Sequence, residues 1–121
     1  KRVLLEFLAE WCEDCQEVVR VSALAPVPEV VSSLYVTVPI NVGRMDRAKL
    51  WREAYKVTHI ATLVVLEPNG KRVAQTTLEP ITGTSGPLSA EALAAWLRKP
   101  VDAPEAVAPA AAPAPEQKET K

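Results

Sequence analysis

The sequence predicts an α/β domain with a mixed four-stranded sheet and helices on both faces. Apolar, β-branched segments alternate with segments whose apolar residues recur at helical spacing. A hairpin turn joins the last two strand-like segments and makes them antiparallel. The 121 residues are 48% hydrophobic and 24% charged, as in one ordinary globular domain. The expected order is strand, helix, strand, helix, strand, strand, helix.

Charge and composition give no support for nucleic-acid binding, a membrane span, a disulfide scaffold or a structural zinc site. The net charge is −1, so no electrostatic force favours nucleic acid as a partner. No run of about 18 uncharged apolar residues is present, so no membrane span is expected. The two cysteines are too few for a multi-bridge disulfide scaffold or for a four-coordinate zinc site of their own.

The first half of the chain contains two strand-like segments. Residues 3–9 form a nearly continuous apolar run, which is typical of a strand covered on both faces. After Cys12 the pattern becomes helical, until Pro26 and Pro28 stop this helix and a short one restarts. Residues 35–42 alternate and are rich in β-branched side chains, which predicts the second strand.

The next helix is expected to begin at Asp46, whose carboxylate is a suitable N-cap. Its apolar stripe comprises Leu50, Trp51, Ala54 and Tyr55. Trp51, like Trp96 on the last helix, is therefore expected in the core. Residues 62–66 form the third strand. Two successive strand-helix-strand units predict parallel neighbouring strands.

The last part of the domain has clear local signals. Residues 67–70 read Glu-Pro-Asn-Gly, a strong hairpin turn that leads into a fourth strand at residues 73–77. Ser89 is a good N-cap for a final helix over residues 90–99.

The composition changes at residue 100, which divides the chain into a folded domain over residues 1–99 and a tail over residues 100–121. The tail holds five prolines and seven alanines without glycine or aromatic residues. Such a segment buries too little apolar surface to offset its ordering entropy, so we expect it to be disordered.

The two cysteines lie where an apolar strand is followed by a helix, in the sequence Trp11-Cys12-Glu13-Asp14-Cys15. Unpaired N–H groups and the positive end of the helix dipole favour a thiolate on Cys12. Two intervening residues in the first helical turn bring Cys15 close enough to form a disulfide. In a strand-helix-strand unit this Cys-x-x-Cys pair indicates redox chemistry. We expect Cys12 to be the exposed nucleophile and Cys15 the shielded resolving thiol.

At this point the sequence resembles the thioredoxin family over nearly all of residues 1–99. The resemblance rests on residues 5–15, Leu-Glu-Phe-Leu-Ala-Glu-Trp-Cys-Glu-Asp-Cys, on residues 57–66 and on the Asn69-Gly70 turn. It implies a thioredoxin-like fold and thiol–disulfide exchange without a bound cofactor. The likeness is closer to bacterial thioredoxin-like domains than to thioredoxin itself, whose motif reads Trp-Cys-Gly-Pro-Cys.

Glu6 matches a position at which thioredoxins carry a buried acid. Leu4 and Leu8 share its face of the strand, which predicts that Glu6 is buried too. Burial raises the pKa of a carboxyl group and suits a proton acceptor for Cys15 during resolution. The alternative is an exposed position at the edge of the sheet.

Two departures from the family pattern affect the predicted chemistry. Glu13 and Asp14 replace a small neutral pair, and their charges oppose a thiolate on Cys12, which predicts a reductant rather than a disulfide donor. Ala61 stands where the family has a proline after a cis bond. Because a cis bond without proline costs about 3 kcal/mol, we expect Ile60–Ala61 to be trans and the loop to differ.

The residues expected to bind the substrate are Trp11, His59, Ile60 and Ala61. His59, the single histidine, lies in the same loop as Ala61. One alternative function is therefore a metal-binding or metal-delivery module that uses Cys12 and Cys15, joined either by His59 or by the Cys-x-x-Cys pair of a second copy. Another is a non-catalytic interaction domain with the same fold.

For the leading function, the expected partners are protein disulfides and a reductase that donates electrons to the protein, which acts as a monomer. The sequence does not begin with Met, and its start looks processed. Together with the Ala/Pro tail, this start favours the bacterial periplasm over the cytoplasm.

Overall fold

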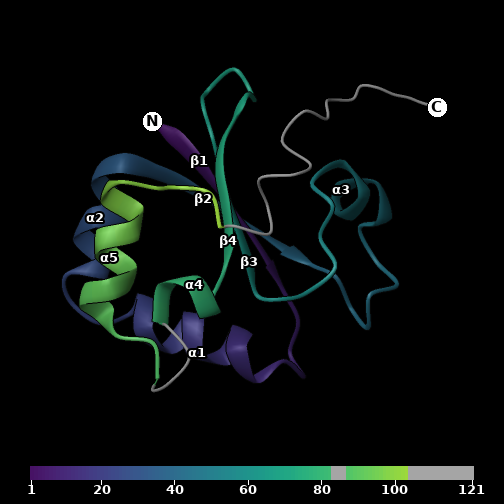
Figure 1. Ribbon diagram of the computed structural model, residues 1–121, viewed down its shortest axis with the longest axis horizontal. Coiled ribbons are helices and arrows are strands. Elements are labelled where there is room, and N and C mark those ends of the chain that lie inside the picture. Colours follow the sequence, from purple (N-terminus) through teal and green to yellow (C-terminus); the bar gives the residue numbers. More distant parts are fainter. Residues whose placement is uncertain (83–86, 104–121) are drawn as a thin grey trace.

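The computed structural model describes residues 1–82 and 87–103, which form a four-stranded mixed sheet with helices on both faces (Figure 1). The strands are β1 (Arg2–Leu8), β2 (Tyr35–Asn41), β3 (Thr62–Leu66) and β4 (Arg72–Thr77). The helices are α1 (Glu13–Ser22), α2 (Val27–Leu34), α3 (Lys49–Ala54), α4 (Glu79–Thr82) and α5 (Ala90–Arg98). The predicted α/β class is confirmed. None of the helices in these two ranges is long and apolar enough to cross a membrane.

The strands lie in the order β2-β1-β3-β4, with β1 and β3 in the centre. β1 pairs with β2 in parallel and with β3 in antiparallel orientation, and β3 pairs with β4 in antiparallel orientation. The first strand-helix-strand unit is thus parallel, as predicted. The prediction for the second unit is wrong because β3 pairs with β1, not with β2. Hydrophobic patterns locate a strand but do not give its direction or its neighbour.

The sheet separates two hydrophobic clusters. Leu4, Leu63 and Val65 face α1, α2 and α5, and this cluster includes both cysteines. Leu5, Phe7 and Val64 belong to the second cluster, where partly buried Met45 and Tyr55 pack against them. Figure 1 shows α3 on one side of the sheet and the other helices on the opposite side. Strands with apolar residues on both faces are therefore buried in the middle of the molecule.

The helix α3 differs most from its sequence prediction. Its N-cap is Ala48, in the left-handed conformation, whereas the Asp46 carboxylate accepts a hydrogen bond from the Arg44 N–H. Leu50 is 80% exposed and Trp51 49% exposed, so this stripe does not enter the core. Trp51 instead stacks on Tyr55, with ring centroids 6.4 Å apart. The helix is only six residues long, too short to bury a full apolar face.

Other local signals predict their structures correctly. The hairpin after β3 is closed by hydrogen bonds between Glu67 and Lys71 and between Gly70 and Glu67, both 2.8 Å long. Gly70 has a φ of 92°, a conformation that glycine adopts without steric cost. The Ser89 hydroxyl caps α5 by accepting the Ala92 N–H at 3.0 Å. Trp96 is buried on this helix, as predicted.

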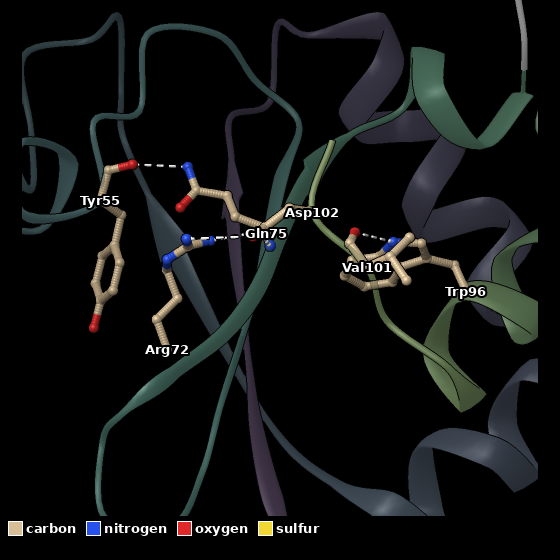
Figure 2. A network of polar contacts seen from close by, with 6 residues as sticks. All are labelled: Tyr55, Arg72, Gln75, Trp96, Val101 and Asp102. Carbon is tan, nitrogen blue, oxygen red and sulfur yellow. Dashed lines mark hydrogen bonds and ion pairs between the residues drawn. The ribbon is translucent and has the colours of Figure 1, made fainter. Parts of the chain in front are cut away.

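After α5 the chain crosses to the outer edge of β4, and residues 101–103, here called the strap, are fixed there (Figure 2). The Asp102 carboxylate accepts a hydrogen bond from the Arg72 guanidinium at 2.6 Å and one from the Gln75 N–H at 3.0 Å. The Ala103 N–H donates to the Gln75 carbonyl, and the Trp96 indole donates to the Val101 carbonyl. Contacts with the domain thus continue beyond residue 99. Residues 104–121, the remainder of the predicted tail, lie outside the described residues.

Candidate redox site

Both cysteines lie at the N-terminus of α1, directly after the central strand β1. Cys12 is the N-cap residue, and its sulfur accepts the Cys15 N–H at 3.1 Å. The sulfur thus satisfies one of the N–H groups that the first turn of a helix leaves without a partner. Both side chains are free thiols in this structure. A thiolate on Cys12 would occupy the same position at the positive end of the helix dipole.

The two thiols differ less in exposure than predicted. Cys12 is 6% exposed and Cys15 2% exposed, so the prediction of an exposed Cys12 is wrong. The reason is that both belong to the cluster between the sheet and α1, together with Ala61. Cys12 remains the slightly more accessible of the two thiols.

Burial has a clear effect on Cys15. Removal from water raises the pKa of this thiol to about 12, and the hydrogen bond with Cys12 acts in the same direction. The negative charges of Cys12 and Asp14 add to the effect. Cys15 is therefore a neutral thiol at physiological pH and must lose its proton before it can attack a disulfide.

The loop before β3 closes the site. The Ile60–Ala61 peptide bond is cis although no proline is present, so the prediction of a trans bond is wrong. That prediction considered only the local preference of the peptide bond. In the folded chain, Ala61 is buried in the hydrophobic cluster that includes both cysteines, and Thr62 begins β3 with its hydroxyl donating to the His59 carbonyl at 2.6 Å. The loop is thus fixed by burial of Ala61 and by this hydrogen bond.

Trp11 and His59, two of the predicted substrate-binding residues, lie on the surface of the site. The Trp11 side chain is half exposed, and its indole N–H donates to the Gly43 carbonyl at 2.6 Å. The His59 ring is exposed, and its Nδ1 lies 3.0 Å from the Thr58 hydroxyl. Ile60 is partly buried between the two hydrophobic clusters. Of these side chains, Ile60 packs against the cluster that contains both cysteines.

Glu6 is half buried in the middle of β1, opposite Pro39 of β2 and Leu63 of β3. Loss of water contact raises the pKa of its carboxyl group, as the sequence predicted. Among the described residues, no hydrogen bond joins this carboxyl to Cys15. Any proton transfer between the two groups would thus need an intervening water molecule.

The geometry does not support a metal site that one copy forms from Cys12, Cys15 and His59. In residues 1–82 and 87–103, no three His, Cys, Asp or Glu side chains are grouped so that they could hold a metal ion. In particular, His59 does not join Cys12 and Cys15 in such a group.

Of the cavities around the site, the two with the best-defined walls were not revealed by sequence patterns. One is an apolar groove of about 490 Å³ beside Cys15, between α1 and the end of β2, with exposed Val19 on its wall. The other is a polar cavity of about 520 Å³ between the His59 loop, the end of β4 and the first turn of α1. The apolar residue Val19 on the outer side of α1 is the one sequence signal that could have indicated the groove.

The arrangement defines a thioredoxin-fold protein with a Cys-x-x-Cys pair at the start of its first helix. No family model matches the sequence, and no curated protein does. Among solved structures, a disulphide isomerase from Xylella fastidiosa is similar, with a TM-score of 0.71 and 25% identity over 82% of this chain and 77% of that one. The germline-specific thioredoxin Deadhead from Drosophila melanogaster has a TM-score of 0.60 and 27% identity, covering 84% of this chain and 82% of its own.

A third structure is similar in fold alone: the oxidised thioredoxin from Plasmodium falciparum, with a TM-score of 0.56 and 21% identity, covers 81% of this chain and 79% of its own. These likenesses confirm the predicted thioredoxin resemblance. With the Cys12–Cys15 pair, they support thiol–disulfide oxidoreductases as the general class to which the protein's activity belongs.

Proposed function

We propose that this protein reduces protein disulfides through a cycle between the Cys12–Cys15 dithiol and its disulfide. The observation that carries the proposal is the position of Cys12 as N-cap of α1, with Cys15 one turn further on and deeper in the core. The high pKa of Cys15 supports the direction of the reaction. Because Cys15 holds its proton, no thiolate at this position stabilises the reduced form, which favours release of electrons.

The reaction begins with the Cys12 thiolate, which attacks one sulfur of a substrate disulfide. A Cys12–substrate mixed disulfide forms, and the second substrate sulfur leaves as a thiolate that takes up a proton. Cys15 then loses its proton and attacks the Cys12 sulfur. This step releases the first substrate sulfur and leaves a Cys12–Cys15 disulfide. Two electrons have passed from the protein to the substrate.

The proposed role of Glu6 is to accept the Cys15 proton through water, because a half-buried carboxylate with a raised pKa is a suitable base. Trp11, His59, Ile60 and the Ala61 backbone form the surface against which the substrate lies. A dithiol reductase must then return two electrons to the Cys12–Cys15 disulfide. We propose a monomer, in the bacterial periplasm rather than the cytoplasm.

Insulin reduction and a redox titration test this function. We expect the protein to reduce insulin disulfides with dithiothreitol as donor, and its midpoint potential to lie nearer to about −270 mV than to about −120 mV. Cys12→Ser should abolish turnover. Cys15→Ser should accumulate a covalent protein–substrate adduct that mass spectrometry detects.

The matched controls for these variants are Ser22→Ala and Ser33→Ala, which change a small polar side chain elsewhere and should leave turnover unchanged. A midpoint near about −120 mV, with oxidation of dithiols in place of insulin reduction, would show a disulfide donor. An inactive wild-type protein with inaccessible thiols would favour the non-catalytic interaction domain.

A further inference from the structure

Helix α3 presents apolar side chains to solvent. Leu50 is 80% exposed and Trp51 is 49% exposed, and Ala54 is exposed as well. These three positions lie on one face of the helix, because residues three and four apart are neighbours on a helix surface. Single exposed apolar side chains are common on soluble proteins, whereas a contiguous group with charged residues around it indicates an interaction site. Leu50, Trp51 and Ala54 are here called the apolar tip.

Aromatic contacts connect the apolar tip with the core. The Trp51 ring stacks on Tyr55, with ring centroids 6.4 Å apart, and Tyr55 contacts Phe7 at a centroid distance of 6.2 Å. Phe7 is fully buried in the hydrophobic cluster against which Tyr55 packs. Figure 1 shows α3 on its own side of the sheet, apart from the other helices. Because the indole is already held by these rings, it loses little side-chain entropy when it meets a partner.

The segment that contains α3 is strongly basic. Residues 43–56, here called the basic segment, contain two acidic side chains and five basic ones: Arg44, Arg47, Lys49, Arg52 and Lys56. The basic segment thus has a net charge of +3, and since the whole chain has −1, the other residues together have −4. The helix is six residues, or about 9 Å, long, so the cations before and after it lie close to the apolar tip.

Most of these cations have no partner within the part of the chain that the structure describes. The exposed side chains that form no ion pair and no hydrogen bond there are Arg44, Arg47, Lys49 and Lys56. Arg52 donates to the Arg47 carbonyl at 2.7 Å, which leaves its positive charge without a counterion. Attraction for negative charge and exposed apolar surface therefore occur at the same place.

We propose that the apolar tip and the basic segment dock the protein on the surface of an anionic phospholipid bilayer. Lysine and arginine attract anionic headgroups, an indole is suited to the headgroup level, and Leu50 projects toward the acyl chains. An acidic protein would have to offer Leu50 a pocket of matching shape, whereas a fluid bilayer adapts to a projecting side chain. This inference goes beyond the proposed function and does not depend on it.

Docking by this surface brings the redox site close to the bilayer. The Trp11 indole donates to the Gly43 carbonyl, at the start of the basic segment. Trp11 also lines a cavity of about 410 Å³ together with Arg44 and Arg47. Because Cys12 directly follows Trp11, the docked protein meets disulfides of proteins at the membrane surface.

Co-sedimentation of the full 121-residue chain with lipid vesicles tests the proposal. One set of vesicles consists of phosphatidylcholine alone, and in the other phosphatidylglycerol replaces part of it. At low salt we expect the partition coefficient to be at least about tenfold higher for the anionic vesicles, since each cation near such a surface contributes about fivefold. In about 0.5 M NaCl the difference should fall to about twofold or less, because salt screens the charges.

Paired variants assign the binding to the basic segment. Arg47→Gln combined with Lys49→Gln should lower partitioning into anionic vesicles about tenfold or more. The matched control is Lys71→Gln combined with Lys99→Gln, which removes two exposed cations outside the basic segment and changes the net charge equally. This control should lower partitioning less than about threefold, because its charges lie farther from the docked surface.

A second pair of variants tests the apolar tip. Leu50→Ser should lower partitioning about tenfold, because the apolar area that enters the bilayer is lost. Val19→Ser is the matched control, at a 60% exposed position of α1 on the other side of the sheet (Figure 1). It should bind anionic vesicles as tightly as the wild type.

Each outcome decides the proposal. Equal partitioning into the two kinds of vesicle, or equal losses in the test and control variants, overturns it. If the protein binds neither kind of vesicle but binds polyglutamate, the surface recognises acidic proteins and the proposal is overturned as well. Cys12→Ser should bind anionic vesicles as the wild type does, so the result is independent of the proposed reductase activity.

Discussion

At the scale of single residues, the structure shows how one strand and one helix give two identical side chains different properties. Cys12 ends the loop after β1 and keeps slight access to solvent, while Cys15 lies one turn into α1 and faces the core. Burial raises the pKa of the deeper thiol to about 12. The carboxyl group of Glu6, half buried on the neighbouring strand, shifts in the same direction for the same reason.

The raised pKa of Glu6 makes stability depend on pH. The folded state holds this proton more tightly than the unfolded state, so the contribution is present below about pH 4.5 and is lost as the pH rises through the folded pKa. Glu6→Gln has no charge to bury. We therefore expect this variant to be more stable than the wild type at pH 7, with the difference shrinking toward pH 4.5, as measured by urea unfolding.

The same variant tests the proposed base. Resolution of the mixed disulfide should slow about tenfold or more in Glu6→Gln, since the proton acceptor is absent. Glu53→Gln, at an exposed position of α3, should alter neither property. A Glu6→Gln enzyme that resolves the adduct at the wild-type rate would exclude Glu6 from proton transfer.

At the scale of elements, the sequence predicted what depends on local chemistry. The Glu67–Gly70 turn and the Ser89 cap formed where their residue types indicated, because each is decided by a few neighbouring dihedral angles and hydrogen bonds. The exposure of Trp51, the direction of β3 and the cis bond before Ala61 could not be predicted in this way. Each depends on which distant element packs against the residue.

The cap of α5 provides a test at this scale. Replacing Ser89 by Ala leaves the Ala92 N–H without its 3.0 Å acceptor and should lower the free energy of unfolding by about 1 kcal/mol. Ser33→Ala, at an exposed position within α2, should have no effect or stabilise by a few tenths of a kcal/mol, given the helix propensity of alanine. Equal values from urea denaturation of the two variants would show that the cap contributes nothing.

At the scale of the whole molecule, the strap joins parts of the chain that are distant in sequence. The Asp102 carboxylate accepts hydrogen bonds from the Arg72 guanidinium and the Gln75 N–H of β4 (Figure 2). The Gln75 side chain in turn donates to the Tyr55 carbonyl, in the segment that precedes the His59 loop. Composition placed the end of the folded domain at residue 99. It could not reveal that one acidic residue in an Ala/Pro-rich segment has a partner 30 positions earlier.

A double-mutant cycle measures this connection. We expect Arg72→Ala and Asp102→Ala to show a coupling energy of about 1 kcal/mol, because the ion pair is largely shielded and hydrogen-bonded. The matched pair is Glu17 and Arg20, which lies within one helix and is more exposed on the arginine side; its coupling should be clearly smaller because solvent screens it. If the two cycles gave the same coupling, the strap would be no more than a surface contact.

The strap also makes the two borders of the sheet unequal. It occupies the outer edge of β4 at Gln75, whereas no described strand pairs with the outer edge of β2, where Val36 and Val38 are exposed. A sheet with one unpaired edge strand can pair with only one other sheet, which gives a dimer. A sheet with two unpaired edge strands can pair on both sides and extend into fibres. The strap thus makes β4 the less available of the two edge strands, because it occupies the Gln75 N–H and carbonyl that a second sheet would otherwise use.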